Sequence, residues 1–275
     1  MLSLADASSY FDRTEVRDPD TNAVLFKGQT DLYDDSRRDA GGAYRRILSV
    51  APGTSRPAGG AVRIRGQVWL LGNLEKDGLE EEHRDKYVLQ AAPVKHSVSR
   101  LSGFLTASVA SSLWGSAEWV KDGKEVEVSS RSVQQYSLYF ASSADVREYD
   151  VIWWGVSSYL ALSVHQQASG FLVATCVKLE YAPADATLNT RVYDPVLGEF
   201  ASSVPTTVRA LRVRWQSLFL YASEADARYV EGDCSIVLPA GTPVATKDTV
   251  TLAGTTWHVV SVETLVGAKV IHGRP

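Results

Sequence analysis

The stretch Val250-Thr-Leu-Ala-Gly254-Thr-Thr-Trp257-His-Val259-Val-Ser-Val262 shows most clearly how this chain folds. Apolar and polar residues alternate up to Gly254, an aromatic residue follows three positions later, and the alternation then resumes. A period of two is typical of half-buried β-strands, and glycine best tolerates the backbone conformation of a tight bend. The stretch therefore predicts two strands joined by a short turn at Gly254.

The same pattern occurs twice more in the chain. Six positions of the first copy match the last copy at a constant separation of 188 residues: 62 with 250, 64 with 252, 66 with 254, 69 with 257, 71 with 259 and 74 with 262. A looser middle copy, Val151 to Ala161, has one extra residue after its glycine. We interpret three glycine–aromatic pairs as the structural anchors of three repeats, with the aromatic rings in the cores: Gly66 with Trp69, Gly155 with Tyr159, and Gly254 with Trp257. Gly72 lies outside the pattern and is expected to tolerate alanine.

The anchor glycines are about 90 residues apart, which is the size of a small β-domain. We therefore expect repeats at residues 1–93, 94–182 and 183–275, with segment 182–189 as the best linker candidate. A strand ending in Asp-Pro or Asp-Gly, found at 14–19, 118–123 and 190–195, predicts that each repeat opens with a hairpin. Chance remains the alternative explanation, because short alternating patterns are common in β proteins.

Frequent turn residues between short alternating segments predict an all-β protein. We expect two to three tandem small β-barrels or sandwiches, with long loops and little helix. Leu101, Leu105 and Val109 follow helix-like steps of four, although the serine-rich sequence around them opposes a helix.

The overall composition excludes several classes of function. The net charge is −4 and the pI is about 5.8, so no basic excess favours nucleic-acid binding. The longest apolar stretch, 151–164, is shorter than the roughly 20 residues of a membrane-spanning helix, and the N-terminus lacks the features of a signal peptide. Cys176 and Cys234 lie in apolar stretches, which predicts buried free thiols, but their mutual distance stays open.

No catalytic or phosphate-binding motif occurs in the sequence, and the five histidines are far apart. The run Asp18-x-Asp20-x-Asn22 matches the start of a calcium loop, but Ala23 and Gln29 stand where that loop needs glycine and glutamate. We therefore predict no enzyme activity, no cofactor and no metal site.

Two charged loops are candidates for contacts with partner molecules. They carry Asp34, Arg37 and Arg38 in segment 31–45, and Asp77, Glu80, Glu81 and Arg84 in segment 75–86. For the second segment, a solvated hairpin tip is the first interpretation and a partner contact is the alternative. Trp153 and Trp154 are adjacent and must face opposite sides of a strand, which places one of them at an interface between domains or subunits.

The stretch Ser235 to Val262 resembles the small β-barrel of the head-closure proteins of tailed bacteriophages, also called stoppers or head–tail joining proteins. In that family a strand ends at a proline turn, and a Gly-Asp pair then begins a strand pair with a central glycine and a later aromatic residue. Pro239, Asp248, Gly254 and Trp257 match this pattern, whereas Lys247 replaces the glycine before the aspartate. The first copy fits with a longer loop and without the aspartate, and the middle copy fits poorly.

The resemblance implies a structural virion protein of the phage neck or tail hub, assembled in the bacterial host cytoplasm. Copies of the chain are expected to form a ring that joins the portal and head to the tail, with portal, adaptor and tail proteins as partners. Genomic DNA is expected to pass through the ring, or be held back by it, without sequence-specific binding, and an acidic protein suits such a conduit. The alternative is a carbohydrate- or receptor-binding β-sandwich module of a virion or a secreted protein.

Overall fold

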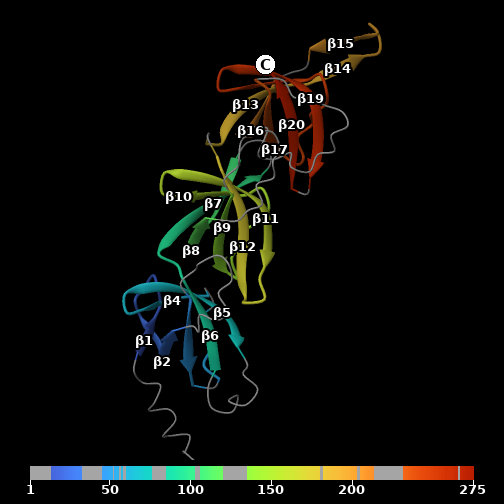
Figure 1. Ribbon diagram of the computed structural model, residues 1–275. Helices are drawn as coiled ribbons and strands as arrows, with labels where there is room; N and C mark the ends of the chain where they lie inside the picture. The colour runs from blue at the N-terminus through green and yellow to red at the C-terminus, as the bar shows by residue number, and fades with distance from the viewer. Residues whose placement is uncertain are drawn as a thin grey trace, which may run out of the picture.

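The computed structural model describes residues 14–32, 45–51, 53–55, 57, 60–75, 85–102, 106–119, 135–179, 182–202, 205–213, 232–265 and 267–275. Every regular element among them is a β-strand, and together they form three closed barrels of six strands, arranged in a row (Figure 1). The expected all-β class of tandem small barrels is therefore confirmed.

The barrels follow one another along the chain. Barrel 1 consists of β1 (Thr14–Arg17), β2 (Val24–Leu32), β3 (Arg45–Val50), β4 (Ala61–Ile64), β5 (Gln67–Glu75) and β6 (Asp85–Ala91). Barrel 2 consists of β7 (Val94–Ser102), β8 (Thr106–Trp119), β9 (Gln135–Ala141), β10 (Val151–Trp154), β11 (Ser157–Gln166) and β12 (Phe171–Lys178). Barrel 3 consists of β13 (Ala184–Asn189), β16 (Thr206–Val213), β17 (Cys234–Pro239), β18 (Thr249–Leu252), β19 (Thr255–Leu265) and β20 (Ala268–Arg274). The remaining strands, β14 (Arg191–Asp194) and β15 (Glu199–Ser202), form a separate hairpin.

All three barrels have the same topology. The strand orders are β1-β2-β3-β6-β5-β4, β7-β8-β9-β12-β11-β10 and β13-β16-β17-β20-β19-β18, and each order closes on its first strand. The middle segment is therefore a true repeat. The expected boundaries after residues 93 and 182 lie between β6 and β7 and between β12 and β13.

The anchor glycines lie in two-residue turns between the fourth and fifth strands of their barrels. Arg65-Gly66 and Ala253-Gly254 both have positive φ at each turn residue, as a type I′ hairpin turn requires. The middle turn places its glycine first: Gly155 has a φ of 58° and Val156 follows it. This shift explains the extra residue in the middle copy, because the pairs Val62–Trp69, Ile152–Tyr159 and Val250–Trp257 all occupy the same ladder position.

Three expectations about the chain order are wrong. The motif at 190–195 does not open barrel 3 but belongs to the inserted hairpin β14–β15, and the motif at 118–123 begins at the end of β8 rather than at the start of a repeat. Segment 182–189 is not a linker, since it contains β13, which pairs with both β16 and β18. The helix-like steps of Leu101 and Val109 fall in the strands β7 and β8. Short patterns reveal strands but not their pairing partners, which the barrel closure decides.

Neighbouring barrels stack through two recurring apolar faces. Face A comprises Ala61, Val68, Leu70, Val88 and Ala92 of barrel 1 and Val151, Leu160, Val177 and Leu179 of barrel 2. Face B comprises Tyr139, Ala141, Phe171 and Val173 of barrel 2 and Leu211, Val213, Val237, Ala268 and Val270 of barrel 3. Face A of one barrel always packs on face B of the next. The cross-strand pairs Ala61–Leu70 and Val151–Leu160 are equivalent on face A, as are Tyr139–Val173 and Val237–Val270 on face B.

A bulge in β5 receives the turn between β11 and β12 of barrel 2. The backbone N–H of Asn73 donates to the carbonyl of Ser169 at 2.7 Å, and its side-chain amide donates to the carbonyl of Ala168 at 2.9 Å. A Cβ atom on Gly72 would lie 2.4 Å from the Ser169 oxygen and 2.9 Å from Phe171 Cζ. The expectation that Gly72 tolerates alanine is therefore wrong, because the neighbouring barrel occupies the space.

Candidate functional site

The aromatic anchor residues lie in the cores of their barrels, whereas the anchor glycines lie in exposed turns. Trp69, Tyr159 and Trp257 are all buried. The guanidinium carbon of Arg46 lies 5.7 Å from the centroid of the Trp69 ring, and that of Arg212 lies 5.7 Å from the centroid of the Trp257 ring. These rings therefore serve packing and cation–π contacts within the fold.

A buried aspartate precedes the fourth strand in barrels 2 and 3. Asp150 Oδ2 accepts the backbone N–H of Arg147, and Asp248 Oδ2 accepts that of Ala245, each at 2.8 Å. The residues before them, Tyr149 and Lys247, have φ values of 67° and 77°. The positive φ explains why the resembling family has glycine at the place of Lys247. Sequence reasoning missed Asp150, although its place just before a strand of the middle copy matches that of Asp248.

The two tryptophans of β10 face opposite sides, as predicted. Trp154 packs on the core of barrel 2 beside Tyr159, whereas Trp153 packs on the apolar cluster between barrels 2 and 3. The interface that one of these residues was expected to occupy is therefore internal to the chain. The predicted partner-contact residues Asp34, Arg37, Arg38, Asp77, Glu80, Glu81 and Arg84 lie outside the described residues.

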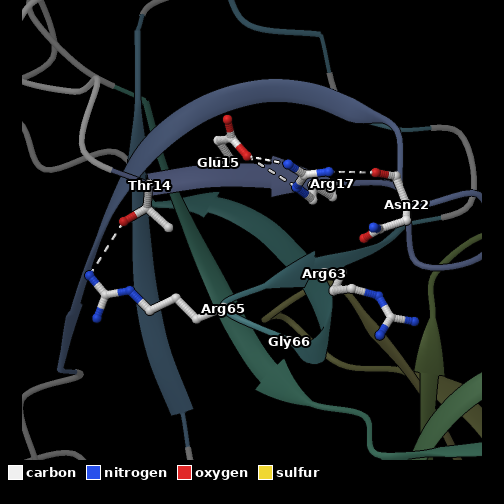
Figure 2. A pocket seen from close by; sticks show the side chains of 7 residues that line it. All are labelled: Thr14, Glu15, Arg17, Asn22, Arg63, Arg65 and Gly66. Carbon is white, nitrogen blue, oxygen red and sulfur yellow. Dashed lines mark hydrogen bonds and ion pairs between the residues drawn. The ribbon is translucent and has the colours of Figure 1, made fainter.

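A pocket of about 480 Å³ opens on the surface of barrel 1, and sequence reasoning did not foresee it. Three of its lining residues are arginines, and the others include one acidic residue: Thr14, Glu15, Arg17, Asn22, Arg63, Arg65 and Gly66 (Figure 2). Arg63 and Arg65 alternate with Val62 and Ile64, so their outward direction was readable from the sequence. Their meeting with Arg17 depends on the pairing of β1 with β4.

The arginines of this pocket are incompletely neutralised. Arg17 Nε donates to Glu15 Oε2 at 3.1 Å and its Nη1 donates to the carbonyl of Asn22 at 2.9 Å, so this side chain lies between the two (Figure 2). Arg63 Nη2 donates to the Pro19 carbonyl at 2.6 Å, while its buried Nε has no hydrogen-bond partner. Arg65 makes one long hydrogen bond, 3.4 Å, to Thr14 Oγ1. Three guanidinium groups against one carboxylate give the pocket an excess of positive charge, although the side chains of Arg63 and Arg65 point to opposite sides of it (Figure 2). Guanidinium groups bind carboxylate or phosphate.

The hairpin β14–β15 projects from barrel 3 and exposes an apolar surface (Figure 1). Val196 is 90% and Leu197 is 71% exposed, and Tyr193 and Phe200 form an exposed edge-to-face pair with centroids 5.4 Å apart. The backbone N–H of Arg191 donates to Asp248 Oδ1 at 2.8 Å and attaches the base of the hairpin to the barrel. Most of the large exposed apolar side chains among the described residues lie on this hairpin, which marks it as a candidate interaction surface.

Three residues of barrel 3 have the types found in hydrolase triads. His272 Nε2 lies 2.7 Å from Asp233 Oδ2, and Ser235 pairs with His272 in the ladder of β17 and β20. Arg274 also donates to Asp233, at 3.0 Å. All three triad-type residues are buried, and Ser235 and His272 have no exposed surface, so a substrate has no access to them. The cluster fits a structural ion pair.

The carboxylates of the calcium-like run are occupied by protein donors. Asp18 Oδ1 accepts hydrogen bonds from Thr21, including one from its backbone N–H at 2.7 Å. These hydrogen bonds lower the Asp18 pKa. Asp20 Oδ1 contacts Lys95 Nζ at 2.7 Å and Trp114 Nε1 at 3.1 Å, which links barrel 1 to barrel 2. Within the described ranges no group of side chains is arranged to hold a metal ion. Cys176 and Cys234 are buried free thiols, as expected, and the structure places them in different barrels.

Comparison with protein-family models, with curated proteins and with solved structures finds no match. In the part of the chain that the structure describes, no helix is long and apolar enough to span a membrane.

Proposed function

We propose that this chain is a non-enzymatic structural subunit of the neck or tail hub of a tailed bacteriophage. In this proposal, copies form a ring that joins the portal and head to the tail and lines or closes the DNA channel. The observation that carries the proposal is the place of Ser235–Val262, the stopper-like stretch, in a closed barrel that stacks on two barrels of the same topology. Apolar faces join the three barrels, which suits a structural virion component.

Location in the virion tests this proposal. Cryo-electron microscopy or immunogold labelling should find the chain between the portal and the tail tube, or in the tail hub. Density only at the distal tail tip or on the fibres contradicts the neck and hub assignment.

Receptor or carbohydrate binding is the second candidate, and the exposed Tyr193–Phe200 pair favours it because sugar sites stack rings on exposed aromatic side chains. A glycan array with the intact chain tests this function. Binding that disappears in the Tyr193→Ala and Phe200→Ala variants, while their melting temperatures stay unchanged, supports the second candidate over the first.

A further inference from the structure

We infer that the arginine pocket of barrel 1 binds the acidic segment 76–84 of a second copy of this chain. The inference rests on the proposed ring and names the contact between its neighbouring subunits. Three guanidinium groups and one carboxylate line the pocket, so it carries an excess of positive charge. Segment 76–84 contains four carboxylates, Asp77, Glu80, Glu81 and Glu82, against the two basic residues Lys76 and Arg84. The two surfaces are therefore complementary in charge.

The arginines at the β4–β5 turn of barrel 1 have no counterpart at the equivalent turn of barrel 3. Arg63 and Arg65 correspond to Thr251 and Ala253 in barrel 3, because the turns Arg65-Gly66 and Ala253-Gly254 occupy the same place. Arg65 and Ala253 have nearly the same φ, 49° and 52°, so the turn sets the backbone and barrel 1 differs by the charged side chain that it adds there. The acidic run is also found in one copy of the repeat, in the connection between β5 and β6.

Distance opposes binding within one copy. The pocket lies at the start of β5, next to Gly66, whereas segment 76–84 leaves from the far end of that strand at Glu75. Eight residue steps of about 3.3 Å separate Gln67 from Glu75, which gives roughly 26 Å. Nine residues, 76–84, join Glu75 to the neighbouring start of β6 at Asp85, and half of that number spans about 15 Å at full extension, which is shorter than this separation. The segment that fills the pocket therefore comes from another copy.

Each copy then contributes a pocket at one end of β5 and an acidic segment at the other end. Such a contact joins two different patches and is heterologous, so repetition closes a ring when the rotation allows it. Both patches belong to barrel 1, so neighbouring copies meet at the same level with their rows of barrels side by side.

Zero-length cross-linking tests the contact. In an R65K variant of the full chain, a carbodiimide joins the new amine to a carboxylate within contact distance. The reaction is performed on a mixture of ¹⁴N- and ¹⁵N-labelled chains at about millimolar concentration and low salt, where even weak contacts are populated. We expect mixed-isotope cross-links from position 65 to Asp77, Glu80, Glu81 or Glu82. The Lys95–Asp20 ion pair, with a separation of 2.7 Å, is the built-in positive control within each copy.

The triple variant E80Q/E81Q/E82Q in the R65K background should reduce the mixed-isotope cross-links at least tenfold and leave the Lys95–Asp20 product unchanged. Three outcomes overturn the inference. Position 65 cross-links only to Glu15, the products contain only one isotope, or no product forms while the Lys95–Asp20 control is intact. The virion location is measured separately. A neck location without this cross-link refutes the contact and leaves the proposed function intact. If the cross-link forms but the protein is found elsewhere in the virion, the contact is supported and the proposed function is refuted.

Discussion

At the scale of single residues, close packing between barrels leaves no room for a side chain at Gly72. The Gly72→Ala variant should lose roughly 1–3 kcal/mol of stability, because the added methyl group overlaps backbone and ring atoms of barrel 2. Gly241→Ala is the matched control, since a Cβ atom there meets nothing within 4 Å. Urea unfolding of both variants measures the difference. Equal urea midpoints for the two variants would show that the contact between barrels 1 and 2 accommodates the added methyl group without loss of stability.

A second residue-scale prediction concerns pH. His96 is buried in barrel 2, its ring 5.4 Å from that of Phe140, and burial lowers its pKa from the ordinary 6.5. Below about pH 6.5 the unfolded chain therefore binds more protons than the folded chain, and stability falls as the pH decreases. The stabilising contribution is fully present above that value. Urea midpoints between pH 7.5 and 5.5 should fall less in His96→Leu than in the wild type, whereas the exposed-site variant His258→Asn should behave like the wild type.

At the scale of elements, the hairpin β14–β15 is an insertion that the barrel does not need. Barrel 1 connects its first two strands through residues 18–23, whereas barrel 3 places the hairpin in the same connection. Replacing residues 190–205 with the sequence of 18–23 should change the stability by less than about 1 kcal/mol, because none of the core residues of barrel 3 lies in the hairpin. Unfolding followed by tryptophan fluorescence tests this prediction. A collapse of barrel 3 would instead give the hairpin a role in folding.

At the scale of the whole molecule, the two outer ends of the row are polar where the inner faces are apolar. Thr249 and His258 occupy the pair position of Val151 and Leu160 on face A, and Lys86 occupies the position of Val173 on face B. Polar residues at the free ends limit the row to three barrels, because an apolar face A on barrel 3 would otherwise pack on an apolar face B of barrel 1 in another copy.

The combined variant T249V/H258L/K86V should therefore associate end to end. Each newly buried side chain contributes about 1.5–3 kcal/mol, so association should tighten by at least about a hundredfold. Sedimentation velocity measures it, with T249V/H258L alone as the control that lacks a matching second face. Circular dichroism checks that the variants fold. Unchanged sedimentation of a folded triple variant would mean that these positions do not limit the stack.

The sequence by itself determined the strand class and the anchor pairs, and it indicated two to three repeats. These follow from local rules, namely alternation along a strand and the demand of a tight turn for glycine at Gly66, Gly155 and Gly254. The opposite directions of Trp153 and Trp154 also follow from strand geometry alone.

Only the tertiary structure decided which strands pair and what lies against each barrel. The hairpin motif at 190–195 and the supposed linker at 182–189 were misplaced because closure of a barrel joins strands that are distant in sequence. Gly72 was misjudged because the atoms that exclude a side chain there, Ser169 O and Phe171 Cζ, belong to another repeat. The arginine pocket arises in the same way, since the pairing of β1 with β4 brings Arg17 beside Arg63 and Arg65. Pairing and packing between distant segments depend on the whole chain, and a local pattern carries no information about them.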